Sequence, residues 1–387
     1  MTIPYGRQDI TQTDIDAVVA TLQSDYLTQG PRVPDFERAV AVHVGAAHAV
    51  AVNSATSALH IACLALGLGP GDWLWTSPIT FVASANCALY CGARVDFVDI
   101  DPRTCNLCPQ ALERKLQQAQ REGCLPKVVV PVHLCGQACD MAAIHALAQR
   151  YGFRVLEDAS HAIGGKYQGG YVGDGRYSDI TVFSFHPVKI ITTAEGGMAM
   201  TNDAGLVDRM ALLRSHGITR EPAQMSHAPE GPWYYQQTEL GFNYRLTELQ
   251  TALGLSQLNR LDEYVARRHQ LARRYDVLLA PLPVTTPWQH PDQYSGLHLY
   301  VVRVDTAASG RTRGQVFAAL HARGIGVNVH YIPVHTQPYY QRLGFRPGDF
   351  PQAERYYEEA ISLPMYATLT EAQQDEVVAV LRDALTE

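Results

Sequence analysis

The first 200 residues alternate short apolar runs with amphipathic stretches, and this rhythm constrains the fold more than any other feature. Helical patterns such as ATSALHIACLALG, PQALERKLQQAQ and DMAAIHALAQRYG follow the first three runs. The predicted strands cover residues 48–53, 95–100, 127–133, 153–158, 179–185 and 196–202. Strands that alternate with helices predict a largely parallel sheet covered on both faces, with ligands bound at the carboxyl ends of its strands.

The pattern changes after about residue 245. Residues 246–280 carry apolar side chains at helical spacing up to the proline-rich PLPVTTP, which predicts one long helix between two domains. Apolar runs at 298–304 and 325–330, with a helix near 312–323, predict a small α+β domain. We therefore expect a large α/β domain with its N-terminal segment over 1–245, and the interdomain helix with a small C-terminal domain over 246–387.

Charge and hydropathy exclude several classes of function. The net charge is −7 and the basic residues are scattered, so no basic stripe indicates a nucleic-acid or anionic membrane surface. No apolar run approaches the roughly 18 residues of a membrane span, and MTIPYGRQDITQTDID lacks the basic start and apolar run of a signal peptide. We expect a cytoplasmic protein with a small-molecule partner.

The eight cysteines do not form a metal pattern. Cys105 and Cys108 form a C-x-x-C, but no second pair follows at zinc spacing, and the motif precedes Pro109 in a loop instead of opening a helix after a strand. His330 and His335 lie five apart, without an acidic or cysteine partner and out of line on a helix. We expect no metal site and no redox role for the C-x-x-C.

The segment NSATSAL suggests a phosphate site of an uncommon kind. Neither a P-loop nor a helix-opening G-x-G-x-x-G occurs in the chain. A strand that ends at Asn53 and a helix that starts at once would offer free N–H groups, with the hydroxyls of Thr56 and Ser57, to an anion. The alternative interpretation is an ordinary helix N-cap.

Two ionisable residues follow the next strands at the same edge of the predicted sheet. Asp158 closes FRVLED, where it could partner a protonated ring nitrogen or simply cap a helix. Lys189 lies among apolar residues in SFHPVKII, where it could bind a phosphate or, with a lowered pKa, form a Schiff base. A phosphate cradle, an acid and such a lysine together are what pyridoxal 5′-phosphate requires.

Ordered motifs along almost the whole chain resemble the DegT/DnrJ/EryC1/StrS sugar aminotransferases, which are fold-type I pyridoxal phosphate enzymes. These motifs are YLTQGPRVPDFE, NSATSAL, EDASHAIG, SFHPVK, TTAEGG and NYRLTELQTALGLSQL. The resemblance implies a three-layer α/β/α large domain with a mixed, mostly parallel sheet, plus a small C-terminal α+β domain. It also implies that Lys189 is the Schiff-base lysine and proton shuttle. The further implied cofactor contacts are Asp158 at the pyridine nitrogen, His161 near the phenolic oxygen, Phe81 on one ring face, and Thr56, Ser57 and Ser184 at the phosphate.

The resemblance further implies a homodimer with shared active sites. Asn243 matches the residue that reaches a phosphate oxygen of the partner's cofactor, and Arg245 would lie near the partner's substrate, although NYR could also be a plain helix start. Motifs such as IPYGRQDI and VNVHYIPVHTQPYY resemble the members that act in pseudaminic acid biosynthesis. These transfer an amino group from glutamate to C4 of a UDP-linked 4-keto-6-deoxy sugar. The implied substrate contacts are Tyr5, His330, Tyr331 and His335.

Three alternatives remain from the sequence. The first is amino transfer to a different nucleotide-linked keto sugar or to a different carbon. The second is a family dehydratase, although these resemble the chain with histidine at the Lys189 position. The third is a regulator, although residues 1–45 are too short and acidic for an added DNA-binding module. Ile190, where we expect proline, affects only loop stiffness. Residues 220–239 are either a lid over the substrate or a surface connection.

Overall fold

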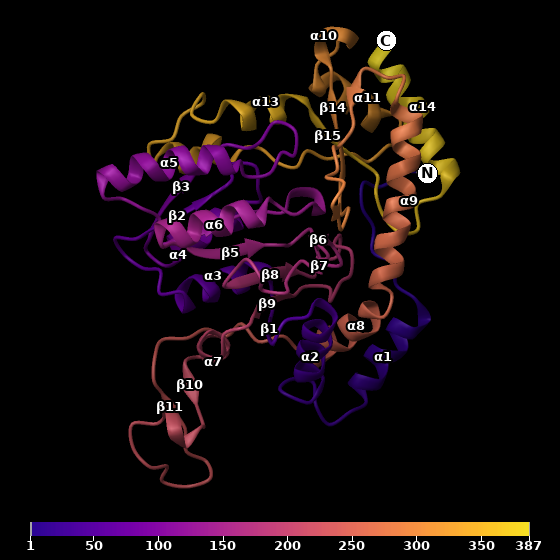
Figure 1. Cartoon of the computed structure of the whole chain (residues 1–387). Coiled ribbons are helices and arrows are strands. Elements are labelled where there is room, and N and C mark those ends of the chain that lie inside the picture. Colours follow the sequence, from indigo (N-terminus) through magenta and orange to yellow (C-terminus); the bar gives the residue numbers. More distant parts are fainter. Residues whose placement is uncertain (1, 387) are drawn as a thin grey trace.

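The computed structural model describes residues 2–386, and a seven-stranded sheet forms its centre (Figure 1). Six strands run in one direction and β9 alone runs in the other. The order across the sheet is β1 (His48–Val52), β9 (Gly197–Thr201), β8 (Ile180–Ser184), β5 (Arg154–Asp158), β4 (Val128–Val130), β2 (Trp73–Thr76) and β3 (Arg94–Phe97). This arrangement confirms the mostly parallel sheet and adds β2, a short strand that the sequence pattern did not reveal.

Helices cover both faces of this sheet, because its strands are apolar on both sides. One core packs the sheet against α3 (Ala55–Ala65), α4 (Ala83–Tyr90) and α7 (Ala204–Arg214). The other core packs it against α2 (Arg32–Val44), α5 (Pro109–Glu122) and α6 (Met141–Tyr151). The three-layer α/β/α architecture is therefore confirmed.

The predicted long helix is two helices. The chain forms α8 (Glu248–Leu258) and α9 (Leu261–Leu279), which are separated at Asn259 and Arg260. Apolar spacing continues through the break because both helices bury one face: α8 packs against α1 (Gln12–Leu22) and α2, and α9 packs into the small C-terminal core. The periodicity could not reveal the break, since it reports which side is buried and not whether the axis is straight.

The C-terminal region builds a second, three-stranded sheet with its own core. Its antiparallel strands are β12 (Val284–Thr285), β14 (Tyr300–Val304) and β15 (Ala360–Leu363). The helices beside it are α10 (Thr306–Ser309), α11 (Arg313–Ala322) and α14 (Glu371–Thr386). Residues 325–330 form no strand and make only isolated bridges with Ile3 and Ser362.

The segment between these last elements returns to the large sheet. It contains the 3-10 helix η3 (Val334–Thr336), α12 (Pro338–Gln341) and α13 (Pro351–Glu359). Tyr340, Phe350 and Tyr356 are buried in the same core as α3 and α4. This segment follows residue 245 in the sequence but joins the core of the large sheet. Sequence position alone therefore does not show which core a segment joins.

Short elements complete the fold. The 3-10 helix η1 covers Leu134–Gly136, and a small sheet joins β13 (Gln293–Tyr294), β6 (Lys166–Tyr167) and β7 (Gly170–Tyr171). A two-stranded hairpin of β10 (Ile218–Thr219) and β11 (Gln236–Gln237), with η2 (Pro222–Gln224) in its loop, projects away from the body in Figure 1. The predicted lid at 220–239 lies in this hairpin, and its movement stays a prediction.

Candidate active site

A cavity of about 520 Å³ lies at the carboxyl ends of β5 and β8, the edge that the sequence pattern indicated. It gathers residues from the large sheet, the start of α3 and the 328–331 segment. The sequence-predicted residues that line it are Tyr5, Thr56, Phe81, Asp158, His161, Ser184, Lys189, His330 and Tyr331. The fold thus brings together nine predicted residues that are separated by up to 326 positions in the chain.

Asp158 is the buried acid of the cavity. Its Oδ2 accepts a hydrogen bond from the Ser84 hydroxyl (2.5 Å), and its Oδ1 accepts from the hydroxyl (2.6 Å) and the backbone N–H (3.1 Å) of Ser160. The carboxylate retains acceptor capacity toward the cavity, where a protonated ring nitrogen would fit.

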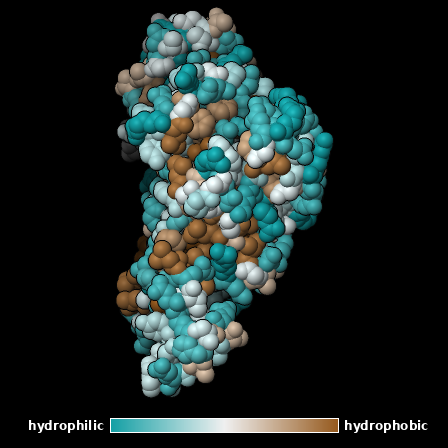
Figure 2. All heavy atoms as spheres, turned by 90° about the vertical axis from the view of Figure 1, so that its left-hand side faces the viewer, coloured by the Kyte–Doolittle hydropathy of each residue, from teal (hydrophilic) through white to brown (hydrophobic). Residues whose placement is uncertain are grey.

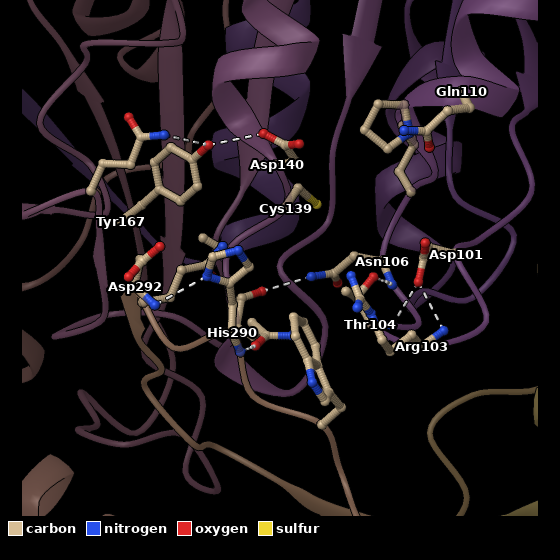
Figure 3. A pocket seen from close by; sticks show the side chains of 17 residues that line it. Asp101, Arg103, Thr104, Asn106, Gln110, Cys139, Asp140, Tyr167, His290 and Asp292 are labelled. Atoms are coloured by element: carbon tan, nitrogen blue, oxygen red, sulfur yellow. Dashed lines mark hydrogen bonds between the residues drawn. The ribbon is translucent and has the colours of Figure 1, made fainter.

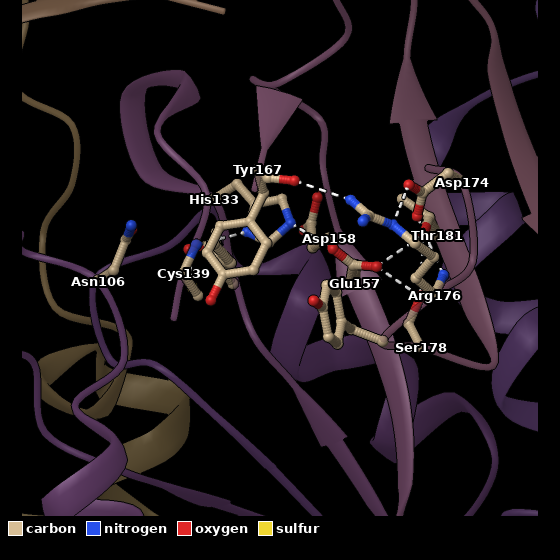
Figure 4. A network of polar contacts seen from close by, with 12 residues as sticks. Asn106, His133, Cys139, Glu157, Asp158, Tyr167, Asp174, Arg176, Ser178 and Thr181 are labelled. Atoms are coloured by element: carbon tan, nitrogen blue, oxygen red, sulfur yellow. Dashed lines mark hydrogen bonds and ion pairs between the residues drawn. The ribbon is translucent and has the colours of Figure 1, made fainter. Parts of the chain in front are cut away.

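The neighbouring acid, Glu157, is directed to the other face of the sheet, because successive side chains of a strand alternate. Figure 4 shows its carboxylate between His133 on one side and Ser178 and Thr181 on the other. It accepts from the His133 Nε2 (2.6 Å), from Thr181 (2.9 Å) and from Ser178. The two neighbouring acids therefore have different roles: Glu157 hydrogen-bonds residues on the other face of the sheet, and Asp158 faces the cavity.

Lys189 follows β8 in a turn closed by its backbone N–H on the His186 carbonyl. Burial lowers the pKa of its amine from 10.5 to about 8, although the Asp158 carboxylate and the Cys135 thiol act in the opposite direction. A pKa near 8 gives the amine a far larger neutral fraction near neutral pH than an exposed lysine has, and a nucleophile and proton carrier needs the neutral form. No hydrogen bond holds the Nζ among the described residues that surround it.

Neutral imidazoles surround the amine. Burial lowers the pKa of His161 well below its usual range and that of His330 to about 4, and the nearby Lys189 adds to both effects. The Nδ1 of His161 accepts from the Cys135 N–H (3.2 Å), so its Nε2 carries the proton that lies toward the Tyr331 hydroxyl (3.0 Å). His161 can therefore donate a hydrogen bond but carries no charge.

The first turn of α3 provides the anion cradle. Ser54 is its N-cap, and the Ser54 hydroxyl accepts from the Ser57 N–H (3.1 Å). The N–H groups of Ala55 and Thr56 have no acceptor among the described residues, and both residues line the cavity beside Ser184. Orphaned donors at a helix start, next to hydroxyls, fit a phosphate group.

Four predicted residues do not line this cavity. Ser57 is the third residue of α3, and its hydroxyl donates to Asn53 Oδ1 (2.6 Å) instead of lining the cavity. His335 is fully buried between Phe97 and Phe350, with its Nε2 2.9 Å from Glu354, so no substrate reaches it. Asn243 and Arg245 lie on the strand-like segment that bridges Ser215 and Val52, outside the cavity.

Several residues of the site were missed by sequence reasoning. Ser84 and Ser160 hold Asp158, and Ser54 rather than Ser57 faces the cradle. His298 also lines the cavity, with its ring centroid 4.6 Å from that of His161. His298 is the first residue of the predicted run 298–304, and a polar side chain at the end of an apolar run was the available signal for it.

A second cavity, of about 390 Å³, is shown in Figure 3. Polar side chains line it, including Asp101, Arg103, Asp140, His290 and Asp292. The Tyr167 hydroxyl donates to Asp140 (3.0 Å), and the pKa of Tyr167 is raised to about 12, mainly by burial. The cavity has no lysine, so it lacks the nucleophile of the first.

Among residues 2–386, no group of three or more histidine, cysteine, aspartate or glutamate side chains is placed to hold a metal ion. Within the same part of the chain, no helix has the length and apolar character for a membrane crossing. Cys105 and Cys108 are free thiols in the loop before α5, which begins at Pro109 as expected.

Comparison with known proteins identifies relatives of full length. The family model described as DegT/DnrJ/EryC1/StrS aminotransferase matches residues 8–382. The spore coat polysaccharide biosynthesis protein SpsC of Bacillus subtilis (strain 168) is 42% identical over 384 residues, which are 98% of this chain and 96% of SpsC.

Solved structures agree with this match. Helicobacter pylori PseC, an aminotransferase involved in the biosynthesis of pseudoaminic acid, has a TM-score of 0.90 and 32% identity, covering 100% of this chain and 99% of PseC. Spr1654 of Streptococcus pneumoniae is 28% identical and is known in a PLP form (TM-score 0.88, covering 100% of this chain and 99% of that chain). Its PMP form has a TM-score of 0.89 and covers 100% and 98% of the two chains.

Proposed function

The chain belongs to the DegT/DnrJ/EryC1/StrS aminotransferase family, and we propose that it aminates C4 of UDP-2-acetamido-2,6-dideoxy-β-L-arabino-hexos-4-ulose with glutamate as the donor. The product is UDP-4-amino-4,6-dideoxy-N-acetyl-β-L-altrosamine, an intermediate of pseudaminic acid biosynthesis. The coarser activity is that of a sugar aminotransferase whose cofactor is pyridoxal phosphate. The observation that carries the proposal is the position of Lys189, Asp158 and the α3 cradle in one cavity.

Each residue has a distinct task toward the cofactor. When bound, pyridoxal phosphate supplies an electron sink that stabilises negative charge at the carbon next to the transferred nitrogen. The Asp158 carboxylate would accept a hydrogen bond from the pyridine nitrogen and keep it protonated. The α3 start, with Thr56 and Ser184, would bind the phosphate, Phe81 would cover one ring face, and His161 would lie near the phenolic oxygen.

Lys189 is the group that moves protons. Its Nζ would hold the cofactor and, as a free amine, would take a proton from one carbon and return it to another. Burial makes this possible, because an amine with a pKa of about 8 can act both as base and as acid near neutral pH. The donor and the keto sugar use the same cavity in turn, which predicts ping-pong kinetics.

Two features support the proposed homodimer. Among the described residues that line the cavity, Lys189 is the one lysine or arginine, yet the cofactor phosphate and a nucleotide diphosphate both carry negative charge. A partner's Arg245, with Asn243 at the phosphate, would supply the missing polar contacts. Asn243 is exposed in a single subunit and therefore free to reach a neighbour.

The surface around Asn243 is apolar. Phe242 and Tyr244 stack with ring centroids 4.9 Å apart, and His60 lies 4.7 Å from Phe242 and 5.4 Å from the half-exposed Tyr90. Figure 2 shows hydrophobic residues gathered on the face of the molecule that lies on the left-hand side of Figure 1. Exposed apolar patches of this kind favour an interface.

An absorbance experiment tests the function. The holoenzyme is mixed with glutamate, which should convert the bound aldehyde form to the pyridoxamine form, and then with the UDP-linked 4-keto sugar, which should restore the first spectrum. If glutamate acts and this sugar does not, the aminotransferase stands and the proposed substrate is wrong. If fully reconstituted protein shows no cofactor band, the assignment of Lys189 is wrong.

Subunit mixing tests the shared site. Lys189→Ala and Asn243→Ala proteins, each inactive, should regain part of the activity when their subunits exchange. The absence of recovery, in mixtures shown to form heterodimers, would contradict the cross-subunit role of Asn243.

The 42% identity with SpsC favours, as a second candidate, amino transfer to another nucleotide-linked keto sugar.

A further inference from the structure

A third cavity, of about 330 Å³, lies behind the wall of the catalytic cavity and is called the rear cavity here. It forms where the loop after β3 and the η1 segment meet the strands of the small sheet. It shares no lining residue with the catalytic cavity. Its lining residues are Arg103, Thr104, Cys105, Leu134, Cys135, Gln137, Thr285, Thr286, Pro287, Trp288, Gln289, Val301, Arg303 and Tyr356.

The rear cavity is positively charged. Arg103 and Arg303 line it, and none of its lining residues is an aspartate or glutamate. The Arg103 guanidinium makes no ion pair with the described residues and lies 4.2 Å from the Trp288 ring centroid. Arg303 lies 3.7 Å from Glu359 Oε2, whereas Arg355 lies 3.0 Å from the other oxygen, Oε1, so Glu359 pairs with both arginines. Among the described residues Arg103 is therefore the lining arginine without a carboxylate partner, and Arg303 adds a second, partly neutralised positive charge.

The cavity of Figure 3 provides an internal contrast. It adjoins the rear cavity, because Arg103, Thr104, Gln137 and Trp288 line both. Three carboxylates line the Figure 3 side, those of Asp101, Asp140 and Asp292. The three carboxylates therefore disfavour an anion in the Figure 3 cavity, and Arg303, which lines only the rear cavity, favours an anion there.

The remaining groups of the rear cavity complete a recognition surface. Thr104, Thr285 and Thr286 offer hydroxyls, and Trp288 offers an aromatic ring. The thiols stay uncharged, since burial raises the pKa of Cys105 to about 11 and that of Cys135 still further. One guanidinium group can bind two phosphate oxygens at once. A cavity of about 330 Å³ has room for a small ligand.

We propose that the rear cavity binds a small phosphorylated ring compound, either a sugar phosphate or a nucleoside monophosphate, independently of the catalytic cavity. The phosphate lies between Arg103 and Arg303, and the ring lies toward Trp288 and the threonines.

Two hydrogen bonds connect this site with the catalytic cavity. The N–H of Cys135 donates to His161 Nδ1 (3.2 Å), and the Tyr356 hydroxyl donates to the His330 carbonyl (2.8 Å). Cys135 and Tyr356 line the rear cavity, whereas His161 and His330 line the catalytic one. A ligand that displaces either residue therefore shifts an imidazole beside Lys189, and we expect it to change turnover without competing with substrate.

Calorimetry on the holoenzyme tests the site, with glucose 6-phosphate and uridine 5′-monophosphate as separate probes. At least one probe should bind the wild type, and Arg103→Met should weaken that binding about tenfold or more, because a charge-assisted contact is lost. Arg346→Met, which removes an exposed arginine that lines none of the three cavities, should bind like the wild type. Comparison of the two probes shows whether a sugar or a base is preferred.

Further outcomes decide against the proposal. Absence of binding by both probes at millimolar concentration overturns it, and so does equal binding by the Arg103→Met and Arg346→Met proteins. Displacement of the bound probe by saturating glutamate and keto sugar assigns it to the catalytic cavity, which also overturns it. Arg303→Met could disturb β14, so the second measurement keeps both arginines. It follows the quenching of Trp288 fluorescence by the probe in the wild type, with Trp288→Phe as the control.

Discussion

Replacement of Lys189 by methionine should stabilise the cofactor-free protein while abolishing its function. The lysine is held in an environment that disfavours its charge, since burial lowers its pKa from 10.5 to about 8. A difference of this size corresponds to about 3 kcal/mol of folding free energy. The value is an upper limit, because Lys189 is partly exposed to solvent in the cavity.

The sign of the effect depends on pH. Below about pH 8 the amine is protonated in both the folded and the unfolded chain, so the whole cost of burying the charge is present. Between about pH 8 and 10.5 the folded protein releases its proton first, and the cost disappears as the pH rises. Methionine has similar length and no charge, so Lys189→Met removes the cost at neutral pH and gains nothing at high pH.

Urea unfolding of the cofactor-free proteins measures this difference. Wild type and Lys189→Met are compared at pH 7 and at pH 10.5, at one protein concentration because a dimer is proposed. We expect the variant to gain up to about 3 kcal/mol in the free energy of unfolding at pH 7, and much less at pH 10.5. Lys166→Met, which removes a lysine outside the cavity, controls for the loss of any lysine. A variant that is no more stable at pH 7, or whose gain does not fall with pH, would refute the reasoning.

Three further substitutions test the cavity. Asp158→Asn should retain some cofactor by absorbance yet lose most turnover, because the amide cannot keep the pyridine nitrogen protonated; full turnover would remove Asp158 from this role. Ser84→Ala removes a 2.5 Å hydrogen bond to the buried Asp158 carboxylate, so turnover should fall about tenfold or more, whereas Thr80→Val, which loses only a bond to Ser84, should have a smaller effect. Gly197→Ala would place a Cβ 2.5 Å from the Ala55 nitrogen, so the cradle must shift; unchanged cofactor affinity in a titration would contradict this account of the α3 start.

Most strands of the large sheet could be predicted from the sequence. Runs such as 153–158 and 179–185 are apolar and bounded, and they form β5 and β8 almost as predicted. The failures have physical causes. β2 consists of four residues and β12 of two, too few for any period to be visible. The predicted helix over 246–280 breaks at Asn259 and Arg260, where both halves remain apolar on one face.

The site was readable in part. Asp158 and Lys189 close or follow parallel strands, and the carboxyl ends of such strands share one edge, so sequence order alone predicts that they meet. Their supports were not readable, since Ser84 reaches Asp158 across 74 positions and Cys135 reaches His161 across 26. His335 shows the opposite error, since a motif placed it near the substrate and the fold buries it against Glu354.

The sequence by itself determined the class of this protein: its strand and helix order, the edge of the sheet that binds ligand, and the residue types for one cofactor. These follow from local periodicity and from the chirality of parallel connections, which leave few topologies open. Only the tertiary structure decided that Lys189 is desolvated, that His161 is neutral, and that two arginines 200 positions apart line a cavity without carboxylates. Burial and long-range contact set these properties, because the pKa of a side chain depends on what the whole fold places around it.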